Sequence, residues 1–159
     1  MFLPISPSIF ISIDGNTALI GASLDDDNGV DSGSAYVFTR TETTWTQQAK
    51  LLASDDAAGD MFGWPVSLSG DTALVGAYLD DGNKGSAYVF TRTGTTWSQQ
   101  AKLLASDGVV EDYFGYAVSL DGDTAIINGG GHDNKGSAYI FTRTGTTWTE
   151  QQKINASDG

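Results

Sequence analysis

Gly85-Ser86-Ala87-Tyr88-Val89-Phe90-Thr91-Arg92 is the stretch that decides the fold, because the chain contains it three times. The same word begins at Gly33 and, with one valine replaced by isoleucine, at Gly136, so the copies are 52 and 51 residues apart. A period of this length is typical of propellers and other repeat architectures. Trp45, Trp97 and Trp148 keep the same spacing, as do Phe62-Gly63 and Phe114-Gly115, and residues 16–19, 71–74 and 123–126 form a further recurring landmark. Recurrence of the tryptophans at strand positions predicts that they pack between blades and are not exposed stacking platforms.

Within a copy, apolar and polar residues alternate over short segments that turn residues separate, as in β-strands. Glycine-containing turns such as Ser69-Gly70-Asp71 favour hairpins between these segments. Four antiparallel strands per copy describe a propeller blade, so the sequence predicts an all-β fold of three four-stranded antiparallel blades, a partial β-propeller. In the second copy the expected strands are residues 62–68, 72–79, 86–93 and 96–105. The expected blades are residues 1–54, 55–106 and 107–159, approximately.

The amino-acid composition of the chain excludes several classes of binding partner. Twenty acidic against eight basic side chains give a formal charge of −12, which repels nucleic acid and anionic membrane surfaces. No stretch has the roughly 20 apolar residues of a membrane span, and the absence of cysteine excludes thiol chemistry and disulfides. The apolar start, residues 1–13, lacks basic residues and is interpreted as a first strand rather than a signal peptide. We therefore expect neither nucleic-acid binding nor membrane insertion.

The pair Phe62-Gly63, followed fourteen residues later by Gly76-Ala77, resembles the FG-GAP repeat of integrin α-subunit propellers, in a variety found in bacterial surface proteins. This resemblance implies an integrin-like β-propeller involved in cell adhesion and protein binding, outside the cell or on its surface. Two departures stand out. The calcium loop of the integrin-type repeat is missing between the two landmarks, and the first copy has Pro7-Ser8 in place of Phe-Gly.

Acidic residues gather in two kinds of connection, the loops between second and third strands and the links between blades, which share one face of an up-and-down propeller. The loops contain Asp25, Asp26, Asp27, Asp31, Asp80, Asp81 and Asp133, and the links contain Asp55, Asp56, Asp60, Asp107, Glu111, Asp112 and Asp158. Such residues commonly just solvate turns. Calcium, however, binds six to eight oxygens of this kind, with affinities on the order of 10⁻⁴ to 10⁻³ M in extracellular modules. The metal-ligand candidates are those that align between copies: Asp26, Asp81, Asp133, Asp55, Asp107 and Asp158.

Catalytic groups are few. His132 is the only histidine and has no serine or cysteine elbow to accompany it. The pairs Glu111-Asp112 and Asp55-Asp56 offer carboxylates for a glycan hydrolase or lyase, although sequence neighbours do not set the separation that such chemistry requires. The sequence therefore predicts a non-catalytic ligand-binding or adhesion module with a protein or glycan ligand. The alternatives are that enzyme and a purely structural segment of a longer propeller.

The number of blades raises the question of closure. Propellers close with about four to eight blades, and this chain supplies three. Two copies that meet head to tail would make six, which predicts a homodimer, whereas the seven-bladed integrin propellers favour a fragment of a longer chain.

Overall fold

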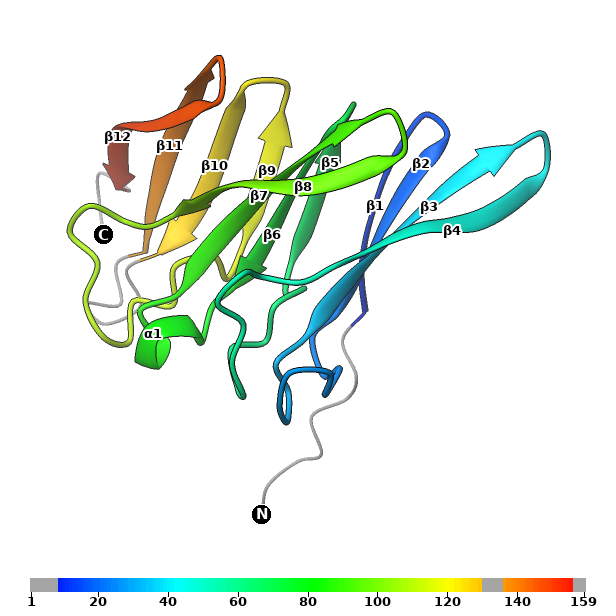
Figure 1. Ribbon diagram of the computed structural model, residues 1–159. Helices are drawn as coiled ribbons and strands as arrows, with labels where there is room; N and C mark the ends of the chain where they lie inside the picture. The colour runs from blue at the N-terminus through cyan, green and yellow to red at the C-terminus, as the bar shows by residue number, and fades with distance from the viewer. Residues whose placement is uncertain (1–8, 130–135, 156–159) are drawn as a thin grey trace.

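The protein forms three four-stranded sheets that stand side by side (Figure 1). The computed structural model describes residues 9–129 and 136–155. The first sheet holds β1 (Ile9–Asp14), β2 (Thr17–Ala22), β3 (Ser34–Thr41) and β4 (Thr44–Leu51). The second holds β5 (Val66–Ser69), β6 (Thr72–Ala77), β7 (Ser86–Thr93) and β8 (Thr96–Leu103). The third holds β9 (Val118–Asp121), β10 (Thr124–Gly129), β11 (Ser137–Thr144) and β12 (Thr147–Asn155).

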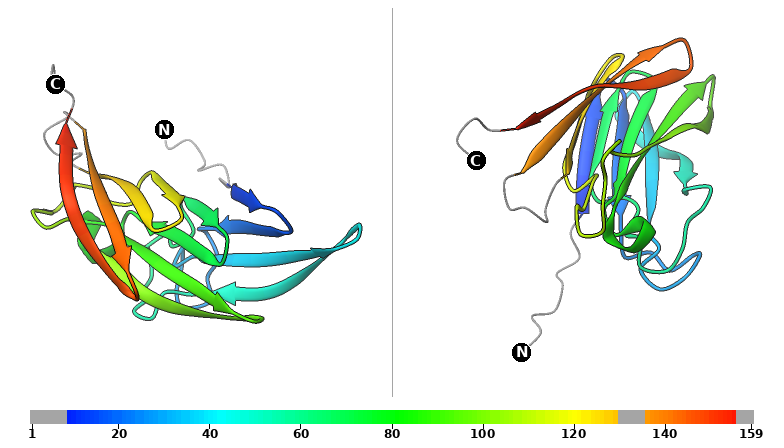
Figure 2. Two further views of the ribbon diagram at one scale, coloured as in Figure 1. Left: turned by 90° about the horizontal axis from the view of Figure 1, so that it is seen from above. Right: turned by 90° about the vertical axis from the view of Figure 1, so that its left-hand side faces the viewer.

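Each sheet has the order and direction of a propeller blade. Neighbours in sequence pair antiparallel throughout, from the first strand to the fourth. The first strands β1, β5 and β9 contact one another, whereas the fourth strands β4, β8 and β12 are spread apart, so the blades fan out from an inner edge (Figure 2). The predicted all-β fold of three antiparallel propeller blades is confirmed.

The first strand of the second blade is shorter than expected. Residues 62–68 were expected to be extended and paired, but β5 begins only at Val66. The preceding residues pair elsewhere: Phe62 forms an isolated parallel bridge with Gly33 of the first blade, and Trp64 forms one with Ala77. Proline has no N–H to donate to a ladder, so Pro65 separates this segment from the strand.

Two apolar cores fill the two gaps between blades. We call the side of a blade that meets the blade before it its leading face, and the opposite side its trailing face. The first core includes Leu19, Val37 and Leu51 on a trailing face and Val66, Leu68, Val75 and Phe90 on a leading face. The second includes Leu74, Val89 and Leu103 on a trailing face and Leu120, Ile127 and Phe141 on a leading face. The middle blade is covered on both sides, and every residue of β6 is buried.

Two of the recurrent tryptophans, Trp97 and Trp148, join neighbouring blades, as their recurrence predicts. The indole Nε1 of Trp97 donates to Gln48 Oε1 of the first blade at 2.9 Å, and Trp148 makes the same bond to Gln100 of the second blade. An arginine lies over each ring at 5.2 Å from its centre. These tryptophans are therefore packing residues between blades and not exposed stacking platforms.

The Phe-Gly segment of each blade is held against the blade before it. The amide of Phe62 donates to the carbonyl of Ser32, and that of Phe114 donates to Lys84, both at 2.9 Å. The chains approach so closely that a Cβ on Gly76 would overlap the carbonyl oxygen of Gly115. The lack of space alone requires glycine at position 76, since the φ of Gly76 is not positive and does not itself demand glycine. Among the described residues, no helix is long and apolar enough to span a membrane.

Replacing Gly76 by alanine is predicted to destabilise the fold by about 2 to 3 kcal/mol, because the new methyl group must push the second and third blades apart. The measurement is chemical denaturation followed by circular dichroism. Gly70→Ala is the matched control: Gly70 has a φ of +55° with nothing within 4 Å of an added Cβ, so it should cost only about 1 kcal/mol. Equal losses in both variants would contradict the close-approach argument.

Candidate functional site: the loop face and its aromatic cluster

In the first two blades, the loops between second and third strands lie at the same end of the molecule as the two described links between blades, and we call this end the loop face. It carries α1 (Asp80–Asn83), a single helical turn, and appears at the bottom of Figure 1. The grouping of acidic connections on one face, which the strand order predicts, is seen for the described residues. Their side chains, however, serve a purpose that the sequence analysis did not identify.

An aspartate, a tyrosine and a lysine recur together on this face. In the second blade, the Tyr88 hydroxyl lies 2.9 Å from Asp80 Oδ2 and 3.0 Å from Asp55 Oδ1. The ammonium of Lys102 lies 2.6 Å from Asp80 and 2.7 Å from Asp55, and 5.4 Å from the centre of the Tyr88 ring. Asp55 belongs to the link and the other three residues to the blade. This cluster therefore fastens the link to the blade that follows it.

The same arrangement appears in the other two blades. In the first, Asp25 accepts hydrogen bonds from the Tyr36 hydroxyl at 2.7 Å and from Lys50 at 3.0 Å. In the third, the link residue Asp107 accepts from Tyr139 at 2.7 Å and from Lys153 at 2.8 Å. We call the three groups the Asp–Tyr–Lys clusters. Their lysines neutralise part of the acidic face from within.

These contacts shift the pKa values of the groups involved. Hydrogen bonds from Tyr36 and Ser34 lower the pKa of Asp25 to about 2. Burial, with the nearby Asp80 charge, raises the pKa of Tyr88 well above its usual range. Hydrogen bonds to Asp107 and Tyr139 raise the pKa of Lys153. Charged lysine, charged aspartate and neutral tyrosine are thus the forms that the fold stabilises.

The four calcium-ligand candidates that lie among the described residues do not form a cage. Asp55 and Asp107 are held by lysine and tyrosine, as described above. Asp26 accepts the amide of Asp31 at 2.9 Å within its own exposed loop. No group of three or more histidine, cysteine, aspartate or glutamate side chains is placed to hold a metal within residues 9–129 and 136–155. Asp133 and Asp158, like His132, lie outside the described residues, so calcium binding stays a prediction.

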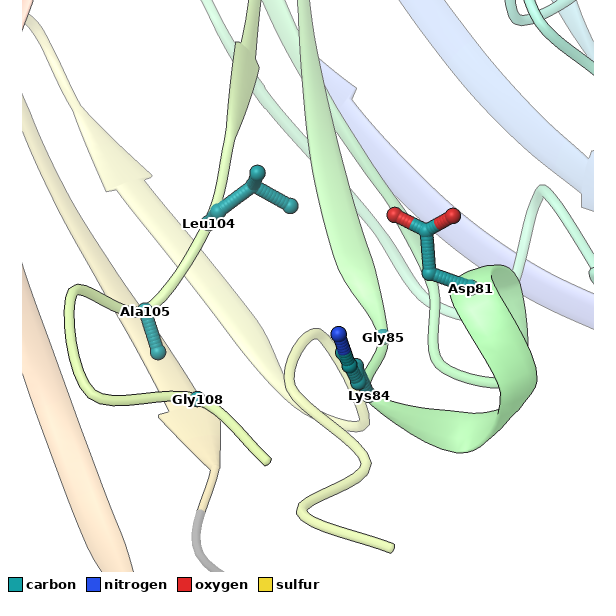
Figure 3. Close-up of a pocket in the computed structure, with 6 residues that line it drawn as sticks. All are labelled: Asp81, Lys84, Gly85, Leu104, Ala105 and Gly108. Carbon is teal, nitrogen blue, oxygen red and sulfur yellow. The ribbon is translucent and has the colours of Figure 1, made fainter. Parts of the chain in front are cut away.

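Asp81 lines a small pocket of about 150 Å³ between α1 and the end of β8 (Figure 3). Its carboxylate is 3.8 Å from the Lys102 ammonium, and Lys84 lines the same pocket. The rest of the lining consists of Gly85, Leu104, Ala105 and Gly108. The volume is well below the 300 Å³ or so of an ordinary ligand pocket, and one carboxylate beside two lysines favours water over a cation.

The residues that sequence reasoning missed form an aromatic cluster at the inner edge of the loop face. Trp64 lies directly before β5, Tyr116 shortly before β9, and Tyr78 directly after β6. The ring centres are 5.4 Å apart for Trp64 and Tyr78, 5.3 Å for Tyr78 and Tyr116, and 4.8 Å for Trp64 and Phe10. Tyr113 joins at 6.3 Å from Tyr78. We call these five residues the axial aromatic cluster.

This cluster is open to solvent, unlike Tyr88 and Tyr139 of the blades. Tyr116 is 51% exposed, and Phe10, Trp64, Tyr78 and Tyr113 are half-buried, whereas Tyr88 and Tyr139 are fully buried. Partial burial raises the pKa of Tyr78 above its usual value. The available signal was that Trp64 and Tyr78 interrupt the repeat: their counterparts in the first copy are Ile9 and Ser23.

Comparison with protein families agrees with this architecture. The FG-GAP repeat family matches three segments of the chain, residues 9–38, 45–90 and 97–141. The chain belongs to the FG-GAP repeat family. The predicted resemblance is thereby confirmed, and each matched segment contains the second strand and most of the third strand of one blade. The comparison with curated proteins found no match.

Loss of the central lysine of an Asp–Tyr–Lys cluster should weaken the FG-GAP fold. Lys102→Met leaves Asp80, whose side chain is only 7% exposed, without its cation, and we expect a loss of about 2 kcal/mol. Lys84→Met, which removes the same charge from an exposed position, is the control and should change stability by less than about 0.5 kcal/mol. Urea denaturation measures both.

The same pair of variants tests whether calcium binds among these carboxylates once the ammonium is gone. Asp55, Asp80 and Asp81 all lie within 3.8 Å of the Lys102 ammonium, so its removal leaves three carboxylates around one empty position. Calcium in the millimolar range should therefore raise the melting temperature of Lys102→Met more than that of Lys84→Met. An equal response, compared with chelator, would count against calcium at these residues.

Alkaline pH is predicted to unfold the protein through the Asp–Tyr–Lys clusters. The pKa values of Tyr36, Tyr88 and Tyr139 are raised in the fold, so native protein binds more protons than unfolded protein above about pH 10. The stability that these groups contribute is complete below that pH and is lost as the pH rises further. Absorbance at 295 nm should show at least three of the six tyrosines ionising together with unfolding, since the pKa of Tyr78 is raised as well. Free titration of all six in folded protein would refute this.

Proposed function

We propose that this FG-GAP protein is a non-catalytic ligand-binding module, of the kind used in adhesion, and that the axial aromatic cluster is its contact surface. The observation that carries the proposal is the position of that cluster. Connected and partly exposed rings stand at the inner edge of the blades, on the face where the loops gather. Half-buried aromatic groups of this kind supply large contact area at low entropic cost.

The charge of the protein and the chemistry of the aromatic rings limit the classes of ligand that the cluster can bind. A formal charge of −12 disfavours acidic partners and favours neutral or basic ones. Aromatic faces bind the apolar faces of sugars and attract cations. The ligand is therefore a glycan or a protein segment without net negative charge. Placement of the module outside the cell or on its surface belongs to the same proposal and rests on the FG-GAP repeats and the acidic composition.

One feature supports the alternative that the protein is a glycan hydrolase or lyase. Burial raises the pKa of Asp60 to about 6, which is typical of a general acid. Asp60, however, accepts the amide of Ala57 at 2.8 Å within its own link, and Asp112 in the next link accepts the amide of Val109 at 2.7 Å. A bond that recurs in both described links, made by side chains that are at most 9% exposed, points to turn stabilisation. A non-catalytic role is the better account.

Binding should depend on the exposed end of the cluster. We predict that Tyr116→Ala weakens binding at least tenfold, equal to about 1.4 kcal/mol, with little change in melting temperature because Tyr116 is 51% exposed. The assay uses labelled protein on an array of neutral glycans and of basic peptides, followed by titration of the best binder. Val110→Ala, an exposed apolar residue of a link, is the control and should bind normally.

Two further variants separate the proposal from its alternatives. Trp97→Ala removes a packing residue between blades and should lower the melting temperature. If it abolished binding without lowering that temperature, the recurrent tryptophans would be the platform. No binding on either array would favour a purely structural segment. Turnover of an arrayed glycan that Asp60→Asn abolishes would establish the enzyme.

A further inference from the structure

The two end blades expose the two halves of one interface. At both internal junctions, the trailing face of one blade packs on the leading face of the next. Among the described residues, none packs on the leading face of the first blade or on the trailing face of the third blade. This inference concerns these two faces and does not depend on the ligand-binding proposal.

The exposed leading face is apolar and hollowed. Ile11 and Ile13 of β1 are 74% and 65% exposed, although their counterparts Val66 and Leu68 in the second blade are buried. Together with Ile20 and Trp45, they line a groove of about 550 Å³. Trp45 corresponds to Trp97, which covers the gap to the preceding blade.

The exposed trailing face shows the complementary change. Leu19 and Leu74 are fully buried at the internal junctions, whereas their counterpart Ile126 is 42% exposed. Leu51 and Leu103 are likewise buried, and their counterpart Ile154 is 39% exposed. The chain thus keeps large aliphatic residues at positions where it offers them no cover.

The polar groups that form hydrogen bonds across the internal junctions also have counterparts on the two exposed faces. At the internal junctions, Ser12 Oγ accepts the amide of Leu68, and Ser67 Oγ accepts the amide of Leu120, each at 3.0 Å. The next residue in this series is Ser119, which is exposed on β9. The amide that would reach it is that of Ile13, the counterpart of Leu68 in the first blade.

A second polar contact follows the same rule. Gln48 and Gln100 each accept the indole N–H of the following blade. In the third blade their counterpart is Gln151, which is exposed, and the indole without such a bond within the described chain is that of Trp45. The donor and the acceptor for a third bond of this kind are therefore both present: the Trp45 indole on the first blade and the Gln151 side chain on the third.

The residues at the positions of the Phe-Gly contact also differ at both ends of the chain. Gly21 and Gly76 allow the backbone of the following Phe-Gly segment to approach, but the third blade has Asn128 at this position. The side-chain amide of Asn128 donates to the carbonyl of Ser137 at 3.5 Å. This carbonyl corresponds to those that Gly63 and Gly115 approach at the internal junctions. A Phe-Gly blade would clash there. The first blade of this chain has Pro7-Ser8 in place of Phe-Gly, and these two residues lie outside the described structure.

We propose that the leading face of the first blade docks on the trailing face of the third blade of a second copy of this chain. Two such junctions, related by a two-fold axis, close a ring of six blades. Rings of one or three copies would have three or nine blades, outside the usual range of about four to eight. The partner that fits both faces at once is therefore a second copy.

Sedimentation velocity tests the proposal. The wild-type protein should sediment as a compact species of twice the 16.7 kDa chain mass at micromolar concentration. Ile11→Asp on one face and Ile126→Asp on the other should each give monomers, because each substitution damages both junctions. Both side chains are exposed in the single chain, so the variants should keep the wild-type circular dichroism spectrum. Val30→Asp, at an exposed loop residue away from both faces, should remain dimeric.

Mixing the variants distinguishes head-to-tail docking from other dimers. In a one-to-one mixture of Ile11→Asp and Ile126→Asp, one of the two junctions joins undamaged faces, so a dimer should reappear. If like faces met, Ile126→Asp or Ile11→Asp alone would leave the dimer intact, which would overturn the proposal. Folded wild-type monomer up to 100 µM, as expected for a segment that other blades of a longer chain complete, would overturn it as well, and so would open-ended polymers.

Discussion

The close approach of backbones between neighbouring blades is the constraint on which the rest of this structure depends. The glycine near the end of one second strand, such as Gly76, lies against the carbonyl of the next blade's Phe-Gly segment, with no room for a Cβ. This contact sets the separation of the sheets at their inner edge. Apolar residues of leading and trailing faces then meet with little empty space, and each blade is stable only through its neighbours.

That separation also decides how the charges of the loop face are used. Once the blades are in place, the link that leaves one blade runs beside the tyrosine and lysine of the next, and link residues such as Asp55 and Asp107 become fasteners. A partly buried carboxylate is costly unless it is paired, and the lysines supply the pairing. Much of the acidic surface is therefore committed to holding the propeller together. The axial aromatic cluster, whose rings come from both of the described links and from the strands beside them, is a surface that these pairings leave open.

The repeat itself carried the correct prediction of the fold. A recurring eight-residue word and alternating apolar residues specify four short strands per copy, because strand periodicity and turn glycines are local properties. The role of Trp97 and Trp148 between blades followed from their recurrence. The start of β5 was misplaced, because Phe62 and Trp64 pair with residues that only the fold brings near.

The sequence by itself determined the fold family, the number of blades and the side on which acidic connections gather, since all of these follow from periodicity and strand order. Only the tertiary structure decided what the acidic residues do. Asp55 and Lys102 are 47 residues apart in sequence, and no local pattern reports that they meet at 2.7 Å. The axial aromatic cluster was equally hidden, because Phe10, Trp64 and Tyr116 come from three different repeats. Their rings become one surface only where the blades converge.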